Sequence, residues 1–218
     1  MTRFKAAVFD MDGLLIDSEP HWDVVIDAVL GELGVVLDQT MRLQTTGMRL
    51  EETLGLWRIW FPDALLEKAH IGKRLAEVMM ERMERVSPKP GAVEVIRMCR
   101  EAGCRLAVAS SSPASVIAAG LARLGVAAQF DAVISADGEP HGKPHPAVFL
   151  SAARALGVPP ADCIAFEDSL NGTKAAVAAG MYCVAVPEGH NLFHAGYDIA
   201  HRKLGSLADF RAEFLADG

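Results

Sequence analysis

The sequence lacks the long apolar and long basic runs that mark membrane and nucleic-acid-binding proteins. Arg, Gly or Pro interrupts the longest apolar stretches before they reach the roughly 20 residues that cross a bilayer. Lys and Arg number 21 against 28 Asp and Glu, for a net charge of −7, and they form no long basic run. We therefore expect neither a membrane anchor nor a nucleic-acid partner.

Cysteine is also scarce, and its spacing argues against a thiolate metal site. None of the four cysteines (Cys99, Cys104, Cys163, Cys183) stands in a Cys-x-x-Cys pair. Two lie in apparent strands, so we interpret all four as buried free thiols in a reducing cytosol; a Cys99–Cys104 disulfide is the less favoured alternative. An apparent strand begins within the first nine residues, so we expect no signal peptide and a cytoplasmic location.

The sequence is rich in apolar residues, and their spacing changes along the chain from a purely helical pattern to an alternation of strand and helix patterns. Apolar residues make up 51% of 218, enough for one large domain or a domain with an insert. From about residue 18 to 87 no strand pattern occurs, and helical spacing predicts helices over 20–34, 50–61 and 63–87, with Gly72 a candidate bend. Ser87 to Gly91 then reads as a stiff linker.

Beyond residue 91, short apolar runs alternate with helical patterns. This rhythm predicts an α/β fold with a Rossmann-like parallel sheet core, residues 1–17 and 88–218, and an inserted α-helical cap domain, residues 18–87. The predicted strands are 6–9, 105–109, 130–135, 163–166 and 182–186, and the predicted core helices are 92–102, 114–124, 147–156, 170–179 and 206–216.

Polar side chains follow several of these strands where each one ends. Asp10 and Asp12 follow the first strand, and an extended backbone there would turn both carboxylates toward one site. Carboxylates that close repel, so the pair needs a cation, a shared proton or good solvation; a plain Asp-Gly turn is the other interpretation. Ser110 and the pair Glu167-Asp168 follow later strands. Ligands bind at this edge of a parallel sheet, so we expect a site there, beneath the helical insert.

These segments together resemble one enzyme family. Asp10-Met-Asp12-Gly13, Ser110, Gly142-Lys143-Pro144 and Glu167-Asp168-Ser169, in this order, resemble the haloacid dehalogenase superfamily in its phosphatase branch. DMDGLLIDSEP and EDSLNG are similar to the β-phosphoglucomutase-like subgroup. Asp-Ser-Glu-Pro followed by Trp22 resembles the bacterial 2-deoxyglucose-6-phosphate and hexitol phosphatases.

The resemblance implies a role for each matching position. Asp10 would be the nucleophile that forms an aspartyl-phosphate, and Asp12 the general acid and base. Lys143 would neutralise phosphate charge and Ser110 would donate a hydrogen bond to a phosphate oxygen. Mg²⁺ would be held by the Asp10 carboxylate, the Asp12 carbonyl and Asp168, with Glu167 nearby or bound through water.

The resemblance and the position of the insert also nominate substrate-binding residues. Ser112 is expected to cap a helix while Ser110 binds phosphate. Arg49 would meet a second anion or sugar hydroxyls, or else lie on the surface; Asn171 would orient Asp168 or cap a helix. The full predicted substrate-binding set is Met11 and Ser111 through their amides, with Glu19, Trp22, Thr46, Gly47, Arg49 and Asn171.

The implied function is hydrolysis of small phosphorylated sugars or sugar alcohols by a monomeric, Mg²⁺-dependent phosphoric monoester hydrolase. The alternative is a β-phosphoglucomutase-like phosphomutase, an isomerase. Family mutases carry a His that helps couple lid closure to chemistry, and Trp22 stands at that position here, which favours hydrolysis.

Overall fold

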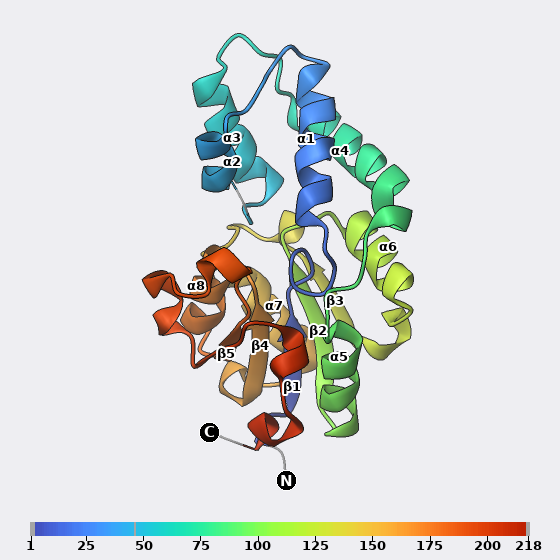
Figure 1. Cartoon of the computed structure of the whole chain (residues 1–218), viewed down its shortest axis with the longest axis vertical. Coiled ribbons are helices and arrows are strands. Elements are labelled where there is room, and N and C mark those ends of the chain that lie inside the picture. Colours follow the sequence, from blue (N-terminus) through green and yellow to red (C-terminus); the bar gives the residue numbers. More distant parts are fainter. Residues whose placement is uncertain (1–2, 46, 217–218) are drawn as a thin grey trace.

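The molecule consists of a parallel sheet and a group of helices that lie beyond the carboxyl ends of its strands (Figure 1). The computed structural model describes residues 3–45 and 47–216. The helices that follow the first strand in sequence lie together above the sheet in Figure 1, and the later helices flank the sheet. The expected α/β class with a Rossmann-like parallel sheet is confirmed.

Within the described residues the sheet has six parallel strands in the order β3-β2-β1-β4-β5-β6. The strand β1 is central, between β2 and β4, so Asp10, Ser110 and Glu167 come to neighbouring strand ends. The strands are β1 Ala6–Phe9, β2 Arg105–Ser110, β3 Ala132–Ser135, β4 Cys163–Glu167, β5 Tyr182–Ala185 and β6 Arg202–Lys203.

Side-chain size differs between the two faces of the sheet. Alternation along a strand puts Phe9 and Phe166 on one face, where their rings stack 4.8 Å apart, and Val8 and Ala165 on the other. The large side chains pack against α5, α6 and the C-terminal segment, and the small ones against α7 and α8. The helices are α5 Ala92–Glu101, α6 Ala114–Leu124, α7 Ala147–Leu156 and α8 Leu170–Ala178.

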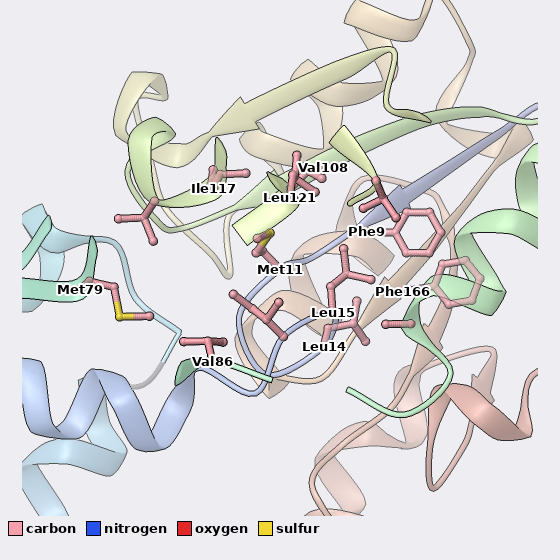
Figure 2. Close-up of a cluster of buried hydrophobic side chains, with 14 of the residues drawn as sticks. Phe9, Met11, Leu14, Leu15, Met79, Val86, Val108, Ile117, Leu121 and Phe166 are labelled. Atoms are coloured by element: carbon pink, nitrogen blue, oxygen red, sulfur yellow. The ribbon is translucent and has the colours of Figure 1, made fainter. Parts of the chain in front are cut away.

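The loop after β1 is fixed by its own apolar side chains. Figure 2 shows Met11, Leu14 and Leu15 in the buried cluster with Phe9 and Phe166. Met11 packs so closely on α6 that a Cβ at Gly120 would lie 1.9 Å from its methyl carbon. The backbone that carries Asp10 and Asp12 is therefore fixed by the packing of the apolar side chains in the same loop.

Helices α1 to α4 form the layer above the sheet edge (Figure 1). Their connections to the sheet run side by side: Asp17 N–H donates to Ser87 O at 2.8 Å, and Lys89 N–H to Leu15 O at 3.0 Å. Met79 of α4 reaches the same apolar cluster as the loop after β1 (Figure 2). The bounds are α1 Glu19–Gly31, α2 Gln39–Thr45, α3 Leu50–Trp60 and α4 Lys68–Arg82.

The helix expected over residues 63–87 is shorter than the sequence pattern predicts. It begins at Lys68 and ends at Arg82, with a 3₁₀ turn to Arg85, and Gly72 does not divide it. Arg58 donates two hydrogen bonds to Leu66 O, which satisfies a carbonyl that a longer helix would use. Leu65, 86% exposed, adds no buried contact that would favour a helix there. Helix α2 was not predicted as a separate element.

The C-terminal helix expected over 206–216 is wrong. The chain forms only short 3₁₀ turns, Leu207–Asp209 and Ala212–Leu215. Phe210 lies between them in extended backbone and packs edge-on against Phe166, so burying it breaks the helical path. The short strand β6 was also missed, because its two charged residues carry no apolar pattern.

No helix in the described part of the chain is both long enough and apolar enough to cross a membrane. Cys99, Cys104, Cys163 and Cys183 are buried thiols, as expected, and no disulfide joins Cys99 to Cys104.

Candidate active site

A tight turn at Gly13 follows β1 and forms one side of the site. Gly13 has φ of 77°, a left-handed conformation that favours glycine, and a Cβ there would lie 2.2 Å from Asp168 Oδ2. Glycine is therefore needed for both the turn and the close approach of Asp168. The turn brings the end of β1 against the end of β4, which supplies Glu167 and Asp168.

Lys143 lies at the bottom of the site between two carboxylates. Its Nζ donates to Asp10 Oδ1 and to Glu167 Oε1, each at 2.5 Å. Lys143 is 3% exposed, Asp10 6% and Glu167 fully buried. Glu167 also accepts hydrogen bonds from the Ser169 N–H and hydroxyl, both at 2.9 Å. The ammonium group is thus fixed at the carboxyl ends of β1 and β4.

A third carboxylate makes the cluster strongly acidic. One oxygen each from Asp10, Glu167 and Asp168 lies within 4.8 Å of the others. Burial raises the pKa of Asp10 well above its usual range, opposed by Lys143; burial, Glu167 and Asp10 raise the pKa of Asp168 in the same way. Lys143 alone does not balance three carboxylates.

These residues fit a divalent cation. Asp168 Oδ1 is buried and has no hydrogen-bond partner among the described residues, which leaves a carboxylate oxygen available as a ligand. Carboxylate oxygens are the ligands that Mg²⁺ prefers, and two positive charges with Lys143 would balance three negative ones. Asp10 and Asp168 are the first candidates, because Glu167 is already occupied by Lys143 and Ser169.

Asp12 is held by a different set of partners. Its Oδ1 accepts from the Ser18 hydroxyl at 2.7 Å and from the Trp22 indole N–H at 2.8 Å. Its Oδ2 accepts from the Ser112 hydroxyl at 2.6 Å and, more weakly, from Ser110 at 3.3 Å. The carboxylate is thus oriented by residues from both the helical segment and the loop after β2.

The expectation that Ser112 caps a helix is wrong. The residue before α6 is Pro113, with no side-chain cap, and the Ser112 hydroxyl goes to Asp12 instead. Ser110 accepts the Ser112 N–H at 3.0 Å and is buried at the end of β2. The Ser-Ser-Ser run therefore orients the acidic turn rather than the helix.

Two adjoining hollows lie beside this cluster. A small one of about 30 Å³ is lined by Asp10, Ser110, Lys143 and Asp168 among others. A larger one of about 150 Å³ extends between α1, α3 and α4, past Trp22, Ile26, Trp57 and Leu75. Both hollows are lined by Asp12, Glu19, Gly47 and Ser111, which therefore mark where the hollows meet.

Comparison of the sequence with protein-family models identifies the family of this chain. The family model for haloacid dehalogenase-like hydrolases matches residues 4–180, from β1 through α8. The chain belongs to this family. The resemblance inferred from the motifs is therefore confirmed, and the hydrolase's clustered acids and lysine are the positions that carried it.

Relatives of the hydrolase include named phosphatases and a mutase. Hexitol phosphatase B of Escherichia coli (strain K12) is 37% identical over 215 residues, 98% of this chain and 97% of that protein. β-Phosphoglucomutase of Bacillus subtilis is 27% identical, covering 93% of this chain and 91% of that one. The crystal structure of CbbY from Rhodobacter sphaeroides in complex with phosphate is 29% identical, with a TM-score of 0.83 over 94% of this chain and 96% of that chain.

Several predicted substrate-binding residues line the hollows. Glu19, Gly47 and Ser111 lie where the hollows meet, and Trp22 lies in the wall of the larger one. Met11 presents its side chain to the core, so only its amide remains a candidate. Thr46 lies outside the described residues. Their roles in binding substrate stay predictions.

Arg49 and Asn171 are not among the described residues that line the hollows. The Arg49 side chain is 12% exposed and donates to the carbonyls of Glu139 and Pro140, so it is not a surface arginine. A contact of either residue with substrate stays a prediction. The cap of α8 is Ser169, which excludes that role for Asn171.

The residues that sequence reasoning missed are the ones that hold others in place. Ser18 and Ser112 bind Asp12, and Ser169 binds Glu167. Ser18 and Ser169 stand within the quoted motifs, in DSEP and EDS, so the signal was present but was assigned to neighbouring residues.

Glu19 should make the stability of the hydrolase depend on pH. Burial, reinforced by Asp12, Asp23 and Glu188 and opposed by Lys89, raises its pKa from 4.5 to about 7. A raised pKa in the folded state gives stability that is present below pH 4.5 and lost as pH rises to about 7. In urea titrations without divalent metal, the free energy of unfolding of Glu19→Gln should rise relative to that of the wild type by about 3 kcal/mol across that window. Parallel curves for the two proteins would contradict the shift.

Proposed function

We propose that the chain is a Mg²⁺-dependent phosphatase that hydrolyses small phosphorylated sugars or sugar alcohols through an aspartyl-phosphate on Asp10. The observation that carries this proposal is the arrangement of Asp10, Lys143 and Asp168 around a small hollow that adjoins a larger one. The small hollow suits a phosphoryl group and the larger one a leaving group. Hexitol phosphatase B, 37% identical, supports the substrate class.

Asp10 supplies the nucleophile. A free Oδ of Asp10 attacks phosphorus, the bond to the leaving oxygen breaks, and the phosphoryl group is carried on the aspartate until water displaces it. Lys143, 2.5 Å from Asp10, offsets the repulsion between carboxylate and phosphate, and Ser110 offers a hydroxyl beside them. Bound Mg²⁺, held by Asp10, the Asp12 carbonyl and Asp168, would neutralise negative charge on the phosphoryl oxygens.

Asp12 handles the protons. It lines both hollows, so it lies where the leaving oxygen departs and where water must later arrive. It donates a proton to the leaving oxygen in the first step and accepts one from water in the second. Trp22, Ser18 and Ser112 orient its carboxylate for these transfers.

Residues 18–87 act as a cap domain over a core formed by residues 1–17 and 88–218. Support for this division comes from the adjacent connections at residues 15–17 and 87–89. The larger hollow, with Trp22, Ile26, Trp57 and Leu75 in its walls, lies between cap helices. At about 150 Å³ it accepts a small molecule rather than a polymer. We also propose that the enzyme works as a monomer in the cytoplasm, which its four buried thiols suit.

A phosphomutase is the second candidate, since β-phosphoglucomutase of Bacillus subtilis is 27% identical. Trp22 disfavours it: the indole at the place of the mutase histidine has only an N–H donor, and that donor is used by Asp12. Phosphate release separates the two reactions, because a mutase interconverts sugar 1- and 6-phosphates with little free phosphate.

A panel of hexose, hexitol and pentose phosphates tests the proposal and its metal. We expect phosphate release from some of these esters with Mg²⁺, loss of at least about 10²-fold after treatment with EDTA, and recovery when Mg²⁺ is added back. Far-UV circular dichroism of the EDTA-treated protein controls for unfolding. Full activity without divalent metal would contradict the metal role, and isomerisation without phosphate release would establish the mutase instead.

A further inference from the structure

We infer that Arg49 and Glu52, at the start of cap helix α3, are positioning residues that hold the loop carrying Lys143. This inference rests on the proposed phosphatase reaction and extends it to residues outside the reacting cluster. Arg49 Nη1 donates to Glu139 O at 2.5 Å and Nη2 to Pro140 O at 2.9 Å. Glu52 Oε1 accepts the Gly142 N–H at 2.7 Å. These bonds join segments 90 residues apart in sequence.

The two cap residues act as one unit. Arg49 Nε donates to Glu52 Oε1 at 3.1 Å, so the same oxygen accepts from Arg49 and from the Gly142 backbone. The Arg49 side chain is mostly buried, and a bidentate arrangement on two successive carbonyls fixes its guanidinium. The result is a rigid contact between the cap and residues 139–142, which we call the latch.

Gly142 is fitted to this contact. A Cβ at Gly142 would lie 2.3 Å from Glu52 Oε2 and 2.8 Å from Arg49 Cγ. Glu52 Oε2 is itself buried without a hydrogen-bond partner among the described residues. Burying a carboxylate oxygen without a partner costs free energy. The hydrogen bonds of the latch must therefore compensate for the burial of Glu52 Oε2 beside Gly142.

The latch lies one residue from the lysine of the active site. Gly142 N–H is held from the cap, and Lys143, the next residue, places its Nζ between Asp10 and Glu167. The cap also touches the loop after β2, where the Ser111 hydroxyl donates to Gly47 O at 3.0 Å. Opening the cap must break these bonds, so docking of the cap and placement of Lys143 occur together.

The decisive measurement is the division of effects between kcat and KM. Without Glu52, the loop of residues 139–142 should shift and move Lys143 away from its position in the transition state; a shift of about 1 Å is enough to slow a reaction greatly. Glu52→Ala should therefore lower kcat by roughly 10- to 100-fold, with KM changed only a few-fold. Glu52→Gln keeps an oxygen acceptor for the Gly142 N–H and should recover most of the loss. A contact with only a structural role would lower thermal stability and leave kcat below the melting temperature unchanged.

Two further variants keep the inference falsifiable. Gly142→Ala changes none of the reacting side chains chemically, but its Cβ would collide with Glu52 and Arg49 and displace the latch, so it should lower kcat as Glu52→Ala does. The double variant should be no slower than about the slower single variant, because both remove one contact. Glu51→Ala is the matched control: Glu51 pairs with Lys68 on the surface, and its loss should leave kcat unchanged.

The outcomes separate this inference from the proposed function. A wild-type chain that hydrolyses no phosphate ester would overturn both. If the wild type is active but Glu52→Ala has an unchanged kcat, the inference about the latch fails and the proposed function stands. The same holds if the fold-losses of kcat in Glu52→Ala and Gly142→Ala multiply in the double variant. Reduced kcat in Glu52→Ala and Gly142→Ala, with recovery in Glu52→Gln and none in the control, supports it.

Discussion

Replacing Asp10 by Asn should lower turnover by about 10⁴-fold or more, to the limit of detection. The amide keeps the shape of the side chain but is a very poor nucleophile, and it removes one negative charge from the proposed metal site. The loss should appear in kcat rather than in KM, because the phosphate-binding groups Lys143 and Ser110 remain. Phosphate release under saturating substrate and Mg²⁺ measures it.

Loss of folding does not account for this expected result. Asp10 is buried and burial raises its pKa, so a neutral side chain relieves repulsion from Glu167 and Asp12. Lys143 keeps its buried partner Glu167, so the Asn variant should unfold at a temperature close to that of the wild type. Acid quenching followed by mass spectrometry should find a phosphoryl group on Asp10 in the wild type and none in the variant. Retained turnover in the variant would remove Asp10 as the nucleophile.

The core of the fold was predictable because its signals are local. Strands β1 to β4 are each a short apolar run followed along the chain by a helix, and the run before Asp10 needs no distant partner to be recognised. The parallel order then brings Asp10, Ser110 and Glu167 together by topology alone. For the same reason the acids could be nominated from the sequence, whereas Lys143 follows no strand directly and was nominated through the family resemblance.

What the sequence did not reveal depends on contacts between distant segments. The run 206–216 has helical spacing, yet Phe210 is drawn into extended backbone by its packing against Phe166. Ser112 suited a helix cap, but Asp12, 100 residues away, takes its hydroxyl. Arg49 was equally hard to place, because its partners are backbone carbonyls of a loop about 90 residues on, which leave no mark in side-chain patterns.

The second large effect is expected at Lys143. Replacing it by Met should lower kcat by about 10³-fold or more, because a fixed positive charge no longer offsets the approach of phosphate to Asp10. The same change leaves Asp10, Glu167 and Asp168 buried without their cation. Removing one partner of a buried ion pair typically costs about 3–5 kcal/mol, so the variant should also be less stable in EDTA.

The pH dependence of that destabilisation follows from the pKa shifts. Lys143 lowers the pKa of Asp10 and of Asp168, so its loss raises both further above their values in the unfolded chain. Raised carboxyl pKa values give stability at low pH that is lost as pH rises, so the variant should fall further below wild type at pH 8 than at pH 5. Chemical denaturation in EDTA at the two pH values measures this.

Magnesium should partly replace the charge of the missing lysine. If the three carboxylates hold a divalent cation, Mg²⁺ should raise the melting temperature of Lys143→Met, because it supplies positive charge that the lysine no longer provides. Lys89→Met is the control: Lys89 pairs with Asp17 at 3.3 Å near the surface, so its loss should cost less than about 1 kcal/mol. A Lys143→Met enzyme with near-normal kcat would show that the phosphoryl group is neutralised elsewhere. A pH-independent loss of stability would show that the buried carboxylates do not depend on this lysine.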